Sequence, residues 1–325
     1  RSLPEVMMML VPEAWEKHLS MDKDKKAFYE YNSCIMEPWD GPASIPFTDG
    51  KYIGALLDRN GLRPSRYSVT KDGYVVMSSE TGVLDILPEN IKLHGRLEPG
   101  KMFLVNMDEG RIVKDDEIKK IITSKFPYHN WIKKNLLQLK DIAEIKNLEK
   151  EESTEFETRM RIFGYTYEDL KTIIIPMSKL AKEAIGSMGT DTPLAVLSDK
   201  PQLLFNYFKQ LFAQVTNPPL DGIREEIITD TSLILGSDFN LFNISEKHCI
   251  KLRIQNPIIS DEDLAKIRYL KNSSFKSYTV KTLYDIDSGF NGIENSLNSI
   301  IKSVEKAVDN DYNLIILSDR GVTKK

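Results

Sequence analysis

Hydrophobic and polar positions change rhythm along the chain, and each rhythm predicts a different element. The apolar residues between positions 3 and 11 recur at helical spacing, which predicts a helix from Pro4 to Val11. Ser2 is placed to cap this helix, and a proline suits its first turn, where its missing N–H costs nothing. We expect Pro12 to break the helix or to restart it as a second one through His18.

Three pairs of short apolar runs follow, each joined by a turn that ends in glycine. Such turns are typical of hairpins, and strands this short favour antiparallel sheets over crossover units. We therefore expect the first 115 residues to form a β-rich α+β unit. The paired runs are 43–47 with 52–57, 67–70 with 74–78, and 102–106 with 111–113.

A charged stretch separates the two halves of the chain. Residues 116–124 and 130–155 are rich in Lys and Glu, which predicts helices. Ile142, Ile145 and Leu148 form one apolar stripe with charges elsewhere. This pattern favours a solvated helix that links two domains.

The second half alternates between predicted helices and strands. Thr166 to Asp169 resembles a capping box, so we expect a helix that runs to Ile175 and stops at Pro176. Residues 194–197 predict a short buried strand, and 203–212 a helix that is apolar on most faces and hence buried between layers.

Later elements continue this alternation. Ser260 is placed to cap a helix over 262–270, and an amphipathic helix over 293–308 precedes an apolar strand over 313–317. Alternating strands and helices predict an α/β domain with some parallel pairing.

Composition narrows the classes of function. The 325 residues suit two domains. With 44 basic and 48 acidic residues, the chain has no basic excess to hold nucleic acid. It has no run of about 18 apolar residues that would predict a membrane span.

Metal and thiol chemistry are not expected within this chain. Its two cysteines, Cys34 and Cys249, lie far apart in sequence, and its four histidines are scattered, which excludes a cysteine cluster site. We expect both thiols to be buried and inert rather than nucleophilic. Because the chain starts at Arg1 rather than Met and ends soon after a strand, we expect an internal stretch of a longer protein.

A first candidate site is the stretch DRNGLRP, which directly follows a predicted strand. Asn60 and Gly61 make a tight turn at low cost. The turn places Asp58, Arg59 and Arg63 at the strand end, where side chains can converge on a ligand. From spacing alone, a hairpin turn with a local ion pair is the favoured interpretation, and the ligand site is its alternative.

A second candidate is the loop that starts at Gly186. With Gly189 and Asp191 it offers backbone N–H groups that can cradle an anion, although it matches no phosphate-binding fingerprint. A close-packed turn explains it as well. Further on, Asn217 precedes two prolines, which predict a rigid, extended backbone after the apolar helix. Arg224 is placed for an ion pair at an interface.

At this point the motifs resemble the large subunit of glutamate synthase. The matching stretches are residues 1–15, 28–50, 57–67, 186–227 and 317–322. The resemblance implies three parts. Residues 1–130 would be the C-terminal part of a type 2 glutamine amidotransferase domain, with the αββα sandwich of N-terminal nucleophile enzymes. Residues 131–160 would be a charged helical linker. Residues 161–325 would be the α/β central domain, similar to a degenerate barrel or open sheet and truncated at its C-terminal end.

The resemblance also implies an activity. The family moves the amide nitrogen of glutamine onto 2-oxoglutarate and makes two glutamates. Ammonia crosses a tunnel to an FMN-bearing barrel domain of the same polypeptide. FMN and an iron–sulfur cluster are expected in the full-length protein and not on this stretch, and a small NADPH-oxidising subunit is an expected partner. The family implies a bacterial cytoplasmic location, or the plastid stroma in a photosynthetic eukaryote. The electron donor stays open, with NADPH favoured over ferredoxin.

Site residues carry over only where the motif matches. The family's nucleophile is an N-terminal Cys, so no catalytic residue is expected here, and the chain alone should be inactive. Met188 and Thr216 match residues that line the ammonia tunnel. The loop from Asp58 through Gly61 to Arg63 matches the one that closes the glutaminase side, in a supporting role.

Two alternatives remain. Another class II amidotransferase, of the phosphoribosyl-transferring or asparagine-forming kind, would explain DRNGLRP but not the 186–227 match. An independent non-catalytic α/β binding module is the other.

Overall fold

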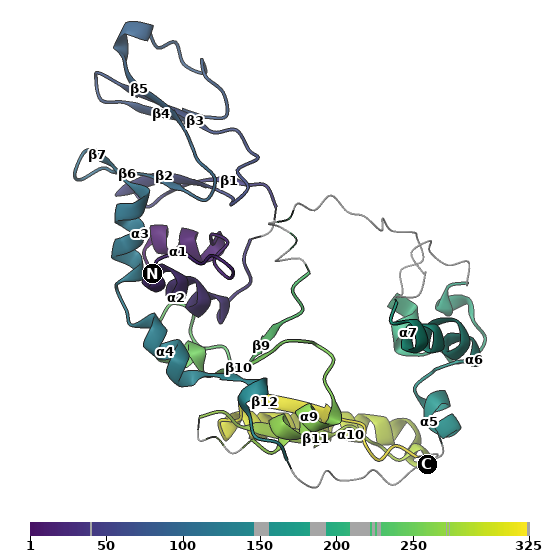
Figure 1. The fold of residues 1–325 in the computed structure, drawn as a ribbon. Helices are drawn as coiled ribbons and strands as arrows, with labels where there is room; N and C mark the ends of the chain where they lie inside the picture. Colours follow the sequence, from purple (N-terminus) through teal and green to yellow (C-terminus); the bar gives the residue numbers. More distant parts are fainter. Residues whose placement is uncertain are drawn as a thin grey trace. The chain divides into compact units, whose positions relative to one another are not determined.

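The fold is taken from a computed structural model (Figure 1), which describes residues 1–39, 41–145, 156–182, 193–208, 222, 225, 229–270, 272 and 274–323. The contacts divide the chain into two compact units. The first comprises residues 1–145, 221–277 and 311–314, and the second comprises residues 146–220, 278–310 and 315–325.

The first unit is mixed α and β. Its helices are α1 (Leu3–Leu10), α2 (Lys23–Ser33), α3 (Asp115–Thr123), α4 (Tyr128–Asn135) and α9 (Asp261–Arg268), with short 3₁₀ turns η1 (Pro88–Asn90), η2 (Leu139–Asp141) and η6 (Glu246–Cys249). Its strands are β1 (Ser44–Thr48), β2 (Tyr52–Leu57), β3 (Arg66–Thr70), β4 (Val75–Ser78), β5 (Ile91–Arg96), β6 (Met102–Asn106), β7 (Arg111–Val113), β8 (Leu136–Gln138), β9 (Leu233–Leu235) and β10 (Lys251–Ile254). Their sheets have the orders β1-β2-β6-β7, β4-β3-β5 and β8-β10-β9.

The start of the chain folds as predicted only in part. The α1 helix is confirmed, and the Ser2 hydroxyl accepts a hydrogen bond from the Glu5 N–H at 3.4 Å. No helix follows over residues 12–18. The chain instead makes a turn there, and α2 begins only after Asp22, whose carboxylate caps it. Pro12 therefore breaks the first helix without restarting it.

All three predicted hairpins are confirmed. Antiparallel registers join β1 to β2, β3 to β4 and β6 to β7. These hairpins could be predicted because each turn depends on neighbouring residues alone. The glycine that ends each turn has a positive φ, which other residues rarely adopt.

Side chains on β2 and β6 alternate between two buried faces. Leu56 and Leu104 point to the main core, which α1 and α2 also form. Leu57 and Phe103 point to a smaller core shared with the β4-β3-β5 sheet. The described part of this unit thus has a helical layer, a sheet and a second sheet, as Figure 1 shows.

The predicted linker helix is wrong beyond Asn135. The α3 helix is confirmed, but residues 136–138 form β8, which pairs in parallel with β10. Leu136 and Leu139 are buried there. Pairing with a strand more than a hundred residues away outweighs the local helical pattern. Residues 142–145 are not helical, and 146–155 lie outside the described residues.

The second unit contains helices α5 (Phe156–Ile162), α6 (Tyr167–Asp169), α7 (Ile175–Leu180) and α10 (Gly289–Asp309), the π-helical turn η3 (Leu170–Ile174), the 3₁₀ turns η4 (Ala195–Leu197), η5 (Leu204–Phe208) and η7 (Ile286–Ser288), and strands β11 (Ser277–Lys281) and β12 (Leu314–Ser318).

The capping box at Thr166 is confirmed. Its hydroxyl accepts from the Asp169 N–H at 3.1 Å, and the Asp169 carboxylate accepts from the Thr166 N–H at 2.9 Å. The predicted stop at Pro176 is wrong, because the helix continues to Leu180. The π turn η3 ends two residues before the proline, and such a turn changes the hydrogen-bond register close to the missing proline N–H.

Two predictions of buried apolar elements are also wrong in the described residues. The expected strand at 194–197 contains the 3₁₀ turn η4, with the Leu197 side chain 72% exposed. The expected helix from 203 is the 3₁₀ turn η5 as far as it is described, and Phe208 is 81% exposed. Pro193 and Pro201 stand just ahead of these turns and lack the N–H groups that regular pairing needs.

The end of the chain matches its prediction. Ser260 caps α9, and α10 and β12 are confirmed. Hydrogen bonds join Asn313 to Lys276 and Thr282 to Ser318, so β11 and β12 run in the same direction, with α10 between them in sequence. This is the expected parallel strand–helix–strand unit. Among the described residues, no helix combines the length and apolar content that crossing a bilayer requires.

Candidate functional site

The DRNGLRP loop leaves the end of β2, and Asp58 anchors it. Asp58 is 6% exposed. One carboxylate oxygen accepts from the Ala43 N–H at 3.1 Å, and the other from the Asn60 N–H at 3.0 Å. The carboxylate therefore ties the loop to the chain just ahead of β1.

The turn that follows requires glycine. The Gly61 N–H donates to the Asp58 carbonyl at 3.0 Å, and Gly61 has φ +62°. A Cβ atom at this position would stand 2.5 Å from Cγ of Pro99. Glycine is needed both for the backbone conformation and for the close approach. Arg59 is half-buried, whereas Arg63 is exposed.

A second loop, Glu98 to Gly100, packs against the first. The Gly100 N–H donates to the Asp58 carbonyl at 3.2 Å. Gly100 has φ +65°, and a Cβ atom there would lie 4.0 Å from Cα of Arg59. The two loops therefore support one another through backbone contacts.

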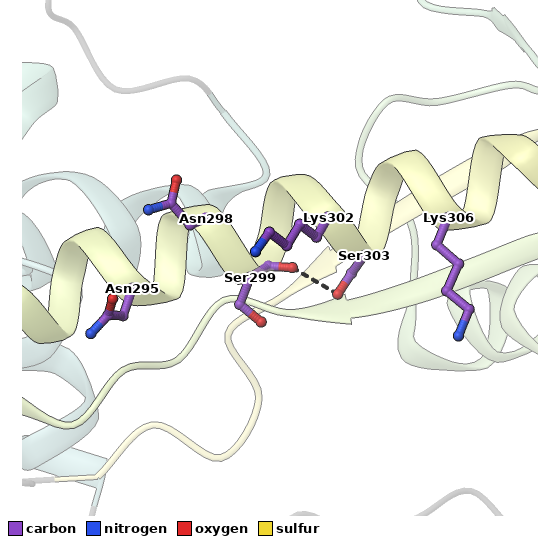
Figure 2. Close-up of a pocket in the computed structure, with 6 residues that line it drawn as sticks. All are labelled: Asn295, Asn298, Ser299, Lys302, Ser303 and Lys306. Atoms are coloured by element: carbon purple, nitrogen blue, oxygen red, sulfur yellow. Dashed lines mark hydrogen bonds between the residues drawn. The ribbon is translucent and has the colours of Figure 1, made fainter.

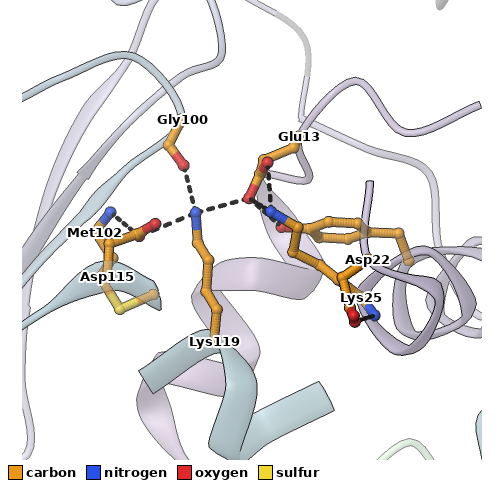
Figure 3. A network of polar contacts seen from close by, with 8 residues as sticks. Glu13, Asp22, Lys25, Gly100, Met102, Asp115 and Lys119 are labelled. Atoms are coloured by element: carbon orange, nitrogen blue, oxygen red, sulfur yellow. Dashed lines mark hydrogen bonds and ion pairs between the residues drawn. The ribbon is translucent and has the colours of Figure 1, made fainter. Parts of the chain in front are cut away.

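Below this second loop lies a buried ion cluster (Figure 3). The Lys119 ammonium donates to Glu13 at 2.7 Å and to the Gly100 carbonyl at 2.8 Å, and lies 2.9 Å from Asp115. The same Asp115 oxygen accepts from the Met102 N–H at 2.7 Å. Lys119 is 4% exposed, so its charge is neutralised inside the protein.

The Glu13 carboxylate accepts hydrogen bonds from three side chains. Besides Lys119, it accepts from Lys25 at 3.1 Å and from the Tyr29 hydroxyl at 3.2 Å. Burial alone raises the pKa of the Glu13 carboxyl, but the ammonium groups of Lys119 and Lys25 outweigh burial and hold that pKa below its usual value. Burial, together with Glu13, raises the pKa of Tyr29 well above its usual value.

Sequence reasoning missed this cluster. Lys119 stands in a stretch read only as a charged helix, and Glu13 in one read as a helix restart. One signal was available: Lys119 lies between Ile118 and Ile122 on the apolar side of α3, with Asp115 one turn before it.

A third feature ties two distant segments of the first unit together. The Tyr31 hydroxyl donates to the Ser245 carbonyl at 3.0 Å and accepts from the Ser245 N–H at 3.2 Å. An ion pair joins Arg253 to Glu30 at 3.0 Å. Helix α2 therefore binds the η6–β10 segment through both neutral and charged contacts.

The two cysteines meet at the same place. Both are buried, as predicted, and their thiols share a hydrogen bond although 214 residues separate them in sequence. The bond to Cys34, with burial, raises the pKa of the Cys249 thiol. A buried thiol with a raised pKa is a poor nucleophile.

The described residues offer little for other chemistry. They hold no group of three or more His, Cys, Asp or Glu placed to bind a metal ion. A polar groove runs along α10 (Figure 2), but its lining comes from one helix face and includes no carboxylate, imidazole or thiol. The residues are Asn295, Asn298, Ser299, Lys302, Ser303 and Lys306.

Of the predicted site residues, the structure describes the five of the DRNGLRP loop. The remainder lie outside the described residues: Met188, Thr216, Gly186, Gly189, Asp191, Asn217 and Arg224.

Comparison with known proteins matches two families to successive parts of the chain. Residues 1–131 match the family of class-II glutamine amidotransferases. Residues 158–325 match the glutamate synthase central domain. The chain thus joins a class-II glutamine amidotransferase part to a glutamate synthase central domain.

Similar curated proteins narrow the class further. The chain is 46% identical over 318 residues to the glutamate synthase [NADPH] large chain of Bacillus subtilis, covering 98% of this chain and 20% of that protein. It is 40% identical over 337 residues to glutamate synthase [NADH] of Schizosaccharomyces pombe, covering 100% and 16%. For ferredoxin-dependent glutamate synthase 2 of Synechocystis, the identity is 40% over 325 residues, covering 98% and 20%. The chain belongs to the glutamate synthase family, and it spans about a fifth or less of the length of these relatives.

Proposed function

We propose that this chain is part of a glutamate synthase, which converts glutamine, 2-oxoglutarate and a reductant into two glutamates. The observation that carries the proposal is that a class-II amidotransferase part and a glutamate synthase central domain follow one another in one chain. Hydrolysis of glutamine releases ammonia and one glutamate. Ammonia then condenses with the keto carbon of 2-oxoglutarate, water leaves, and a two-electron reduction of the imine gives the second glutamate.

The proposed division of the chain follows the resemblance. Residues 1–130 are the C-terminal part of the amidotransferase domain. Residues 131–160 link this domain to the central domain, which residues 161–325 form. The helix–sheet–sheet order of the first unit supports three layers of an αββα sandwich. The parallel β11–β12 pair supports an α/β central domain. FMN and the iron–sulfur cluster belong to other parts of the polypeptide.

The supporting role of the DRNGLRP loop rests on its bracing. Both carboxylate oxygens of Asp58 accept hydrogen bonds from backbone N–H groups, so Asp58 is proposed to hold the loop and not to transfer protons. We assign Asp58, Arg59, Asn60, Gly61 and Arg63 to shaping the edge of the glutaminase site and no step of bond breaking to this chain.

Coupling between the domains has a physical basis in the first unit. Three residues of the central-domain match bind α2 of the amidotransferase match or the residue that ends it: Ser245 contacts Tyr31, Arg253 contacts Glu30, and Cys249 contacts Cys34. A central-domain segment built into the amidotransferase unit supports the proposal that the two domains respond to one another.

The ammonia tunnel is proposed at Met188 and Thr216. Ammonia is small and readily protonated in water, so its path should be narrow and partly apolar, with a few oxygens for hydrogen bonds. A methionine is flexible enough to act as a gate. The loop residues Gly186, Gly189, Asp191, Asn217 and Arg224 are proposed to shape this part of the central domain.

The experiment that tests the tunnel uses the full-length synthase with Met188→Trp or Thr216→Trp. Glutaminase turnover should persist while glutamate formation from glutamine falls, and added ammonia should still support glutamate formation. Met107→Trp is the control, because Met107 is an exposed methionine of the first unit. Equal loss of both activities in the Met188 and Thr216 variants contradicts the tunnel role.

The electron donor is proposed to be NADPH, supplied through a small pyridine-nucleotide-oxidising subunit. The relative with the highest identity given above is of the NADPH type, while NADH and ferredoxin types follow at 40%. A bacterial cytoplasm, or a plastid stroma, is the corresponding location. Glutamate formation assayed with NADPH, NADH and reduced ferredoxin decides between the donors.

A further inference from the structure

The backbone of Gly100 links the DRNGLRP loop to the ion cluster. Its N–H donates to the carbonyl of Asp58 in the DRNGLRP loop, and its carbonyl accepts from the ammonium of Lys119 in the ion cluster. The backbone there has φ +65°, which glycine adopts without the steric cost that a side chain would bring. A shift of Lys119 therefore acts on the loop by way of Gly100.

Lys119 itself has little freedom. An ammonium group has three N–H donors, and Glu13, Asp115 and the Gly100 carbonyl supply three oxygen partners within 2.9 Å. A buried ammonium is costly unless its partners stay in place. Asp115 also holds the Met102 N–H at the start of β6. The cluster thus fixes residues 100 to 102 relative to α3.

Contacts pass this constraint to the DRNGLRP loop. Besides the hydrogen bond from Gly100, Pro99 lies so close to Gly61 that no Cβ atom fits between them. The loop from Glu98 to Gly100 cannot move toward Gly61 without a clash, and it cannot move away without losing the bond to Asp58. Displacement of one loop is therefore a displacement of the other.

We propose that Lys119, held by Glu13 and Asp115, is a positioning residue for the glutaminase reaction: it sets the loop from Asp58 to Gly61 that borders the glutaminase site. This inference rests on the proposed function. It assigns Lys119 no contact with substrate.

The test replaces Lys119 in the full-length synthase. Lys119→Met keeps the length of the side chain and removes its charge and donors. The glutaminase kcat/KM should fall about 10- to 100-fold, the size of effect that a misplacement near 1 Å produces from outside the reacting centre. Glutamate formation from added ammonia should be unchanged, and Lys119→Arg, which keeps the charge, should recover most of the glutaminase activity.

The matched control is Lys251→Met. Lys251 is as buried as Lys119, at 4% exposed, and is also paired with a carboxylate, that of Asp238, but it lies on β10. It should lower thermal stability and leave the glutaminase kcat/KM within about twofold. If Lys119→Met does not fold, Glu13→Gln takes its place, because the amide keeps an oxygen for Lys119 while removing the negative charge. A smaller loss of the same kind is then expected.

Provided that the wild-type enzyme is active, three results overturn the positioning role. The first is an unchanged glutaminase kcat/KM in Lys119→Met, or in Glu13→Gln where that variant is used. The second is an equal loss of glutaminase kcat/KM in Lys251→Met, and the third is an equal loss of glutamate formation from added ammonia. A wild-type enzyme without any glutamine-dependent activity contradicts the proposed function itself, and the positioning role falls with it. The two failures are therefore distinguishable.

Discussion

Replacing Gly61 by alanine should destabilise the first unit far more than an ordinary Gly→Ala change. The backbone there has φ +62°, and the new Cβ atom would stand 2.5 Å from Cγ of Pro99 and 3.2 Å from its Cα. A proline ring joined to the backbone cannot swing aside as a long flexible side chain can. The loop from Glu98 to Gly100 would have to move as a whole.

The magnitude has two parts. A left-handed conformation costs an L-residue about 1–2 kcal/mol relative to glycine. Forcing extra atoms into a packed contact typically costs about 1–3 kcal/mol more. The free energy of unfolding should therefore fall by about 2–5 kcal/mol in Gly61→Ala.

A control separates the two parts. Gly110, in the turn between β6 and β7, has φ +60°, and a Cβ atom there would meet nothing within 4 Å. Gly110→Ala should therefore cost only the conformational part, about 1–2 kcal/mol. The difference between the variants measures the contact with Pro99.

The assay is urea unfolding of this chain followed by tryptophan fluorescence. All three tryptophans, Trp15, Trp39 and Trp131, belong to the first unit, so the signal reports that unit alone. Combining Gly61→Ala with Pro99→Ala should recover part of the loss, because the ring atom nearest the new Cβ is gone. Equal costs at Gly61 and Gly110, or strict additivity with Pro99→Ala, would refute the close packing of the two loops.

Two further predictions concern buried polar groups. Because its ammonium partners lower the pKa of Glu13 in the folded state, Glu13 stabilises the protein above its unfolded pKa near 4.5, and this contribution is lost as pH falls through the lower folded pKa. The gap between the urea midpoints of the wild type and Glu13→Gln should therefore be largest at pH 7 and shrink as the pH falls through the folded pKa, and a gap that is constant with pH contradicts the assignment. Cys34 and Cys249 are both buried, so a thiol reagent should label them only at the rate at which the first unit opens; rapid labelling of the native chain would show that the thiols are accessible.

The hairpins and helix caps were predictable because their causes are local. The turn that ends at Gly50, the Ser2 and Ser260 caps, and the capping box at Thr166 each depend on residues within a few positions of one another. The geometry of such motifs can be predicted without knowledge of the rest of the fold. The DRNGLRP loop was located for the same reason.

Elements that depend on distant partners were not predictable. Leu136 to Gln138 form a strand only because β10 lies beside them. Lys119 is buried only because Glu13 and the Gly100 carbonyl come within hydrogen-bond distance from other parts of the chain. The apolar pattern at 194–197 predicted burial, but the described surroundings do not cover these side chains. Periodicity shows which residues can be buried, and tertiary contacts decide which are.

The parallel pairing of β8 with β10 has a consequence for synthesis of the protein. At about 5–20 residues per second, the ribosome needs on the order of ten seconds to proceed from Gln138 to Lys251. During that interval the aromatic surface of Tyr31 and Trp131 lacks the His248 region that later contacts Tyr31. A sheet closed by such a long chain loop forms late and slowly. The nascent chain should therefore depend on chaperones until β10 has emerged.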